Sequence, residues 1–86
     1  MINGTEKDVI KDLLRKFYRH GYWGVKHMRE DSLTKGFPDH LKGRIKDVAE
    51  DLRRKGTLKK WPTSHGIQWC ANIERLEEIE RIIRDC

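Results

Sequence analysis

The sequence has only two cysteines, Cys70 and Cys86, and no Cys-x-x-Cys pair. It therefore offers neither a disulfide scaffold nor a four-cysteine zinc site. No window approaches the roughly 18 uninterrupted apolar residues of a membrane-spanning helix, and the first residues lack the apolar stretch of a signal peptide. We therefore expect a cytoplasmic location and no membrane partner.

The sequence also lacks the usual patterns of metal-dependent or nucleophilic catalysis. None of the four histidines stands four residues from another, the spacing with which one helix presents two histidines to zinc. Cys70 lies in a predicted strand, with no nucleophile turn or Gly-rich phosphate loop beside it. We expect no enzyme activity, no metal and no cofactor.

Charge is abundant and unevenly distributed. The 86 residues are 38% charged and 36% hydrophobic, with a net charge of +5, which suits one solvated domain spanning residues 1–86. Residues 1–72 hold 16 basic and 9 acidic side chains, whereas residues 73–86 hold 3 basic and 5 acidic ones. The cationic body favours a polyanion such as a nucleic-acid backbone. The alternative is a basic surface that binds no anion.

Apolar residues recur at helical period in several segments, which glycine and proline separate. The clearest pattern follows Pro38, where Leu41, Ile45, Val48 and Leu52 fall on one face. The predicted helices are 6–20, 26–33, 38–55 and 73–85.

Residues 57–71 have the pattern of a β-hairpin. A first strand over 57–61 is followed by a turn at 62–66, and residues 67–70 then alternate apolar and other side chains as a returning strand does. In this pattern Trp69 points inward. For the tryptophans we therefore expect core packing, with base stacking as the alternative, and Trp61 near the turn is the least determined.

The order of helix, short helix, reversal, basic helix, hairpin and helix resembles the winged helix-turn-helix superfamily. The most specific part is residues 52–60 (LRRKGTLKK) with residues 62–69 (PTSHGIQW), which resemble the end of a recognition helix, a first strand, a wing tip and a second strand. The resemblance implies a mostly helical α+β fold with a three-helix core, a β-hairpin wing and a C-terminal helix. It also implies that the helix over 38–55 enters the major groove of double-stranded DNA.

The resemblance also indicates which residues contact DNA. The first half of the helix and the hairpin carry the candidates, which are His40, Lys42, Gly43, Arg44, Lys46, Lys59, Lys60 and His65. Gly43 either lets the backbone approach the ligand closely or is neutral. Lysines on a hairpin edge also protect against aggregation, which is the alternative for Lys59 and Lys60. Arg15, Lys16, Arg19 and Lys26 are further cations that the sequence does not place.

The last predicted helix carries an apolar face formed by Leu76, Ile79 and Ile83. This face either forms a homodimer or packs on the helix over 6–20.

We expect a double-stranded DNA-binding transcriptional regulator, either sequence-specific or general. The alternative is a winged-helix module for protein–protein interaction that binds no nucleic acid.

Overall fold

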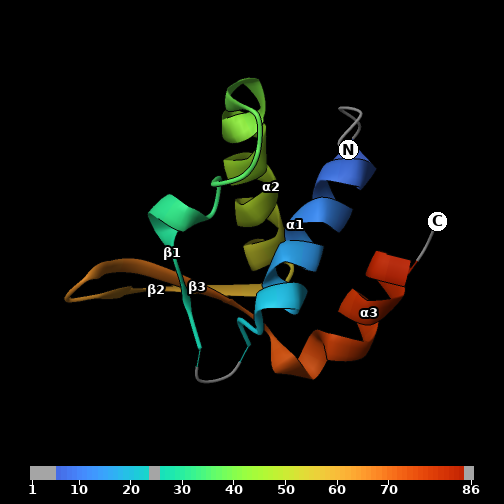
Figure 1. Ribbon diagram of the computed structural model, residues 1–86. Coiled ribbons are helices and arrows are strands. Elements are labelled where there is room, and N and C mark those ends of the chain that lie inside the picture. Colours follow the sequence, from blue (N-terminus) through green and yellow to red (C-terminus); the bar gives the residue numbers. More distant parts are fainter. Residues whose placement is uncertain (1–5, 24–25, 85–86) are drawn as a thin grey trace.

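The computed structural model describes residues 6–23 and 26–84, and Figure 1 shows the helices gathered beside a small antiparallel sheet. The fold is α+β and mostly helical, with the predicted hairpin after the second helix and a helix at the C-terminal end. Its regular elements are α1 (Glu6–His20), β1 (Met28–Arg29), α2 (Lys42–Arg54), β2 (Leu58–Thr63), β3 (Gly66–Ala71) and α3 (Leu76–Arg84). Three short 3-10 turns, η1 (Glu30–Ser32), η2 (Asp39–Leu41) and η3 (Ile73–Arg75), connect them.

Helix α1 has the predicted bounds, because one of its faces is apolar throughout. Val9, Leu13 and Phe17 on that face are completely buried. The helix stops at Gly21, whose φ of 71° is readily available to glycine. The N–H groups of Gly21 and Tyr22 donate back to carbonyls in the last turn, so the end of the helix is hydrogen-bonded.

The predicted helix over 26–33 is wrong. The segment forms strand β1 and turn η1 instead. Met28 is buried opposite Trp69 of β3, while its neighbours His27 and Arg29 are exposed, which is the alternation of a strand. Pairing with β3 buries Met28, and this tertiary contact outweighs a weak local helical pattern.

Helix α2 is shorter than the predicted 38–55, because its first turn is the 3-10 turn η2. Its buried stripe, Ile45, Val48, Ala49 and Leu52, matches the apolar pattern. The chain leaves the helix at Gly56, with φ 86°, and the N–H of Thr57 donates to the Leu52 carbonyl at 2.9 Å. The stripe therefore fixes which side of α2 faces away from the core.

The sheet has the strand order β1-β3-β2, and both strand pairs are antiparallel. The strands of the hairpin extend beyond the prediction, so the turn between Thr63 and Gly66 has only two residues. Leu58 pairs with Ala71 and Lys60 with Trp69, which puts all four side chains on the face that packs on the core. Lys59 therefore points to the opposite face from Lys60.

Helix α3 packs on α1. This was one of the two alternatives predicted for its apolar face. Ile79 is completely buried in the core. The Tyr18 hydroxyl donates to Glu80 at 2.8 Å, and Arg15 donates to the Ile83 carbonyl at 3.3 Å. The predicted helix over 73–85 begins with η3, and residue 85 lies outside the described residues. Within the described residues, no helix has the length and apolarity to span a membrane.

Candidate nucleic-acid interface

The first half of α2 presents the predicted cationic residues to solvent. Because Leu41 and Ile45 are buried, the positions between and after them face outward. The exposed positions include His40, Lys42, Gly43, Arg44 and Lys46. A Cβ atom added to Gly43 would meet no atom within 4 Å. The surface over this part of α2 is therefore accessible to a large ligand.

Two lysines of this surface differ in their surroundings. Lys42 Nζ lies 3.1 Å from the Asp39 carboxylate, which is 96% exposed, so solvent screens the pair and it contributes little. Lys46 makes no ion pair with any residue in the described ranges. A phosphate can thus meet Lys46 without first displacing a carboxylate.

A groove of about 480 Å³ connects α2 to the tip of the hairpin. Lys46 of α2, His65 of the turn and Arg29 of β1 line it, together with Glu30 and Asp31. Both carboxylates have partners: Glu30 accepts from the buried indole N–H of Trp69 at 3.1 Å, and Asp31 lies 3.8 Å from Arg29. The sequence analysis did not identify Arg29 as a site residue. It predicted a helix over 26–33, and a helix does not place Arg29 beside β3.

The hairpin tip is held by its own hydrogen bonds. Thr63 Oγ1 donates to the Gly66 carbonyl at 2.7 Å and accepts from the backbone N–H of His65 at 3.1 Å. The φ of 108° at Gly66 completes the turn. The His65 side chain is exposed and lines the groove, so the tip positions it beside Lys46.

The two hairpin lysines have different surroundings. Lys59 is exposed and forms no ion pair with a residue that the structure describes. Lys60 is half-buried, its Nζ donates to the Glu50 carboxylate, and it lies 5.2 Å from the centre of the Trp69 ring. The Lys60 ammonium, with Arg53, holds the pKa of the Glu50 carboxyl below its usual value. The Lys60 ammonium is therefore occupied by an ion pair within the chain.

The second half of α2 is neutralised by its own carboxylates. Arg53 donates to Glu50 at 2.7 Å, and Lys55 and Arg54 lie 3.1 and 3.7 Å from Asp51. The hydrogen bond from Lys55 lowers the pKa of Asp51. The carboxylates of Glu50 and Asp51 thus offset the positive charge of the second half of α2.

The three residues predicted to form a dimer also have unequal surroundings. Ile79 is completely buried within the chain, so it belongs to the core, and its side chain has no surface left for a partner. Leu76 and Ile83 are half-buried. The large hydrophobic side chain that is clearly exposed in the described part of the chain is Ile73, at 57%.

No group of three or more His, Cys, Asp or Glu side chains within residues 6–23 and 26–84 is arranged to hold a metal ion. Trp69 is 1% exposed and belongs to the core, as predicted. Trp61 is half-buried and packs edge-on against His27, with 4.7 Å between ring centres.

Comparison of the chain with protein-family models, with curated proteins and with solved structures finds no match.

Proposed function

We propose that this chain is a winged helix-turn-helix protein that binds double-stranded DNA and acts as a transcriptional regulator. The order α1, β1, α2, β2, β3 and the antiparallel sheet order β1-β3-β2 support this architecture. In it, the first half of α2 enters the major groove and the hairpin follows the flanking backbone.

The observation that carries the proposal is the exposed cationic half of α2 beside the hairpin tip. Lys42, Arg44 and Lys46 are all solvent-exposed, and Lys46 and His65 line one groove although 19 positions separate them in the sequence. A helix in the major groove, with a second set of contacts to the phosphate backbone, is how such a motif docks on a duplex.

The exposed residues suggest separate roles. Lys42, Arg44 and Lys46 neutralise phosphates or reach guanine edges, and His40 adds a polar contact. The backbone at Gly43 approaches the DNA, because no side chain stands above it. Lys59 and His65 hold the backbone beside the major groove.

The expected strength of the electrostatic contribution follows from the number of exposed cations on this surface. Lys60 pairs with Glu50, so we count the exposed Lys42, Arg44, Lys46 and Lys59 as the phosphate partners. About four contacts correspond to a slope of about −3.6 when log K is plotted against log salt concentration.

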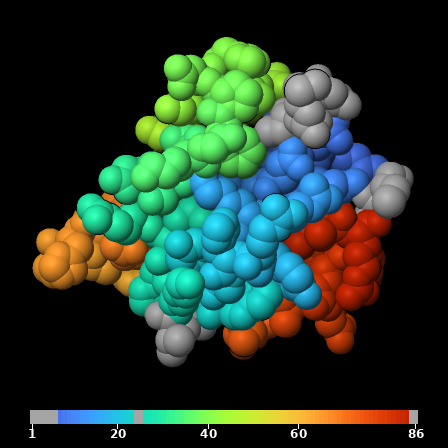
Figure 2. Space-filling view, in the orientation of Figure 1, coloured from blue at the N-terminus to red at the C-terminus, as the bar shows by residue number. Residues whose placement is uncertain are grey.

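The decisive experiment compares Lys46→Glu with Arg81→Glu in fluorescence-anisotropy titrations of a random-sequence duplex at several salt concentrations. Both substitutions reverse one exposed charge, but Arg81 lies on α3, and Figure 2 shows α3 (red) on the opposite side of the molecule from the hairpin tip (orange). We expect Lys46→Glu to weaken binding by about tenfold or more and to reduce the slope by about one, whereas Arg81→Glu changes the slope little. Equal effects of the two variants would refute the proposed interface.

A protein-interaction module is the second candidate, and the exposed Ile73 favours it. In that case Ile73→Ser abolishes capture of a protein partner, and the chain binds no duplex at any salt concentration.

We also propose a homodimer through α3, with Leu76 and Ile83 contributing their remaining exposed surface. Sedimentation equilibrium distinguishes this dimer from a monomer.

A further inference from the structure

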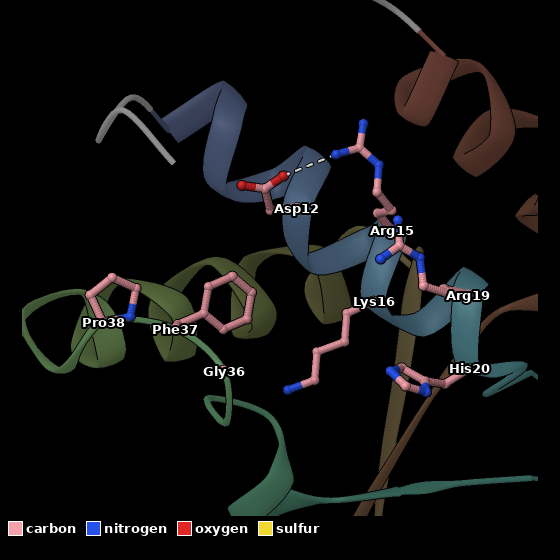
Figure 3. A pocket seen from close by; sticks show the side chains of 8 residues that line it. All are labelled: Asp12, Arg15, Lys16, Arg19, His20, Gly36, Phe37 and Pro38. Carbon is pink, nitrogen blue, oxygen red and sulfur yellow. Dashed lines mark hydrogen bonds and ion pairs between the residues drawn. The ribbon is translucent and has the colours of Figure 1, made fainter. Parts of the chain in front are cut away.

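A second groove lies on the α1 side of the molecule, between the second half of α1 and residues 36–38, which lead into η2. It encloses about 480 Å³, a volume within the range of small-ligand sites. Figure 3 shows side chains of α1 along one wall and Phe37 and Pro38 along the other. None of the contacts proposed for DNA above uses this groove.

Four basic side chains of α1 line this groove: Arg15, Lys16, Arg19 and His20. They are neighbours on the helix surface because residues one turn apart share a face. Placing like charges at this spacing destabilises an isolated helix. Asp12 is the acidic residue of the lining, and it pairs with Arg15 at 3.2 Å. The groove therefore has a surplus of positive charge.

Two of these cations are committed to the fold. Lys16 Nζ donates to the carbonyl oxygens of Leu33 and Lys35, at 3.3 and 2.6 Å, and also to that of Ser32. Its partial burial lowers the pKa of Lys16, as does the nearby Lys35. Arg15 binds Asp12 and the end of α3. Lys16 thus contributes charge to the groove while it holds the opposite wall in place.

The other two basic side chains have N–H donors available to a ligand. Arg19 and His20 are both exposed, and neither forms an ion pair with a residue of the described ranges. The His20 ring packs beside the ring of Tyr22, with 5.8 Å between centres. The guanidinium of Arg19 can therefore present its donors to a ligand in the groove, and its planar fork matches the oxygens of a phosphate.

The opposite wall is apolar. Phe37 is half-buried, and its ring centre lies 5.4 Å from Lys16 Nζ. A ring next to a cationic cluster suits a ligand with a charged end and a planar end. Pro38 extends this wall.

We propose that this groove binds a phosphate group, with Arg19 as the bidentate donor, His20 as a second donor and Lys16 as a nearby charge. A phosphate monoester carries about 1.5 to 2 negative charges at neutral pH, so it offsets the surplus better than a carboxylate does, whereas a backbone phosphate carries one charge. The phosphate comes either from a small phosphate monoester, whose other end packs on Phe37, or from a nucleic-acid backbone. The proposal holds whether or not α2 binds DNA.

The test follows backbone amide signals by NMR while inorganic phosphate is added, against sodium chloride at the same ionic strength. We expect saturable shifts centred on Arg19, His20 and Phe37 with phosphate and none with chloride. Arg19→Gln should weaken phosphate binding about tenfold, since a charged bidentate contact is lost. Arg81→Gln removes an equivalent exposed charge on α3 and should change nothing. Unsaturable shifts, or equal affinity in the wild type and Arg19→Gln, would overturn the proposal.

Two further ligands identify the source of the phosphate. If phenyl phosphate binds at least tenfold more tightly than inorganic phosphate, and Arg19→Gln leaves duplex affinity unchanged, the ligand is a small monoester. If phenyl phosphate has no advantage and Arg19→Gln weakens duplex binding, the groove holds a backbone phosphate. Lys46→Glu tests the α2 interface separately, so failure of one site does not imply failure of the other.

Discussion

Replacing Glu50 by Gln should weaken the fold and at the same time strengthen binding to duplex DNA. The Glu50 carboxylate accepts hydrogen bonds from Lys60 and from Arg53. It holds Lys60 in the angle between α2 and the hairpin, on the core-facing side of β2. Glutamine retains an acceptor but lacks the charge, so Lys60 becomes available to a phosphate of the duplex.

The size of the stability change follows from the exposure of the pair. The side chains of Lys60 and Glu50 are 28% and 32% exposed, so the pair is better shielded than an ordinary surface ion pair. Exposed pairs contribute up to about 1 kcal/mol, and we expect Glu50→Gln to lower the free energy of unfolding by about that amount at neutral pH.

The pH dependence has a definite sign. The pKa of Glu50 lies below its ordinary value of 4.5 in the folded chain, so the folded state favours the charged carboxylate. The stabilisation is therefore present above about pH 4.5 and disappears as the pH falls through the folded-state pKa. Urea denaturation of the wild type and Glu50→Gln should differ at pH 7, and the difference should shrink as the pH falls through the folded-state pKa of Glu50.

The binding change has its own magnitude. One additional phosphate contact makes the salt slope steeper by about 0.9, so between about 50 and 200 mM salt the variant loses about 3.5-fold more affinity than the wild type does. Asp51→Asn is the matched control, since it also neutralises a carboxylate of α2 but releases Lys55 and Arg54 instead. If both variants have the same slope, Lys60 does not face phosphate and the placement of the duplex against the hairpin is wrong.

Three further substitutions test the fold and the interface. Asn72→Ala should cost about 1–2 kcal/mol in urea denaturation, because Asn72 donates to the Gly56 carbonyl at 2.8 Å and caps η3. Trp69→Phe should lower the free energy of unfolding by about 1–3 kcal/mol in thermal melts, since it removes the bond to Glu30 and leaves a void. Gly43→Ala should stabilise the chain by about 1 kcal/mol, because α2 has open space there, yet weaken duplex binding measured by anisotropy. Unchanged affinity of Gly43→Ala would show that the backbone does not approach DNA at this position.

Much of the fold follows from apolar spacing. The stripes that define α1 and α2 are strong enough to fix both helices, and the glycines at 21 and 56 end them. Segment 26–33 was mispredicted because its structure depends on a distant partner: Met28 becomes strand only through its pairing with Trp69. The residues next to Met28 in the sequence do not indicate that pairing.

The candidate site was predictable in part. Exposure of Lys42, Arg44 and Lys46 follows directly from the buried stripe of α2. The position of Lys60 was also available from the sequence, because the alternation that turns Leu58 inward puts Lys60 on the same face. Its partner Glu50 was not, since the angle between helix and hairpin is set by packing.

The carbonyl groups that Lys16 binds have a consequence for the order in which the chain folds. Residues 32–35 belong to no strand, so their carbonyl groups form no strand-pairing hydrogen bonds. Three of these carbonyls accept instead from the Lys16 side chain of α1. This segment gains these hydrogen bonds only after α1 is helical and docked. We therefore expect it to be the last to become ordered during refolding and among the first to open in native-state hydrogen exchange.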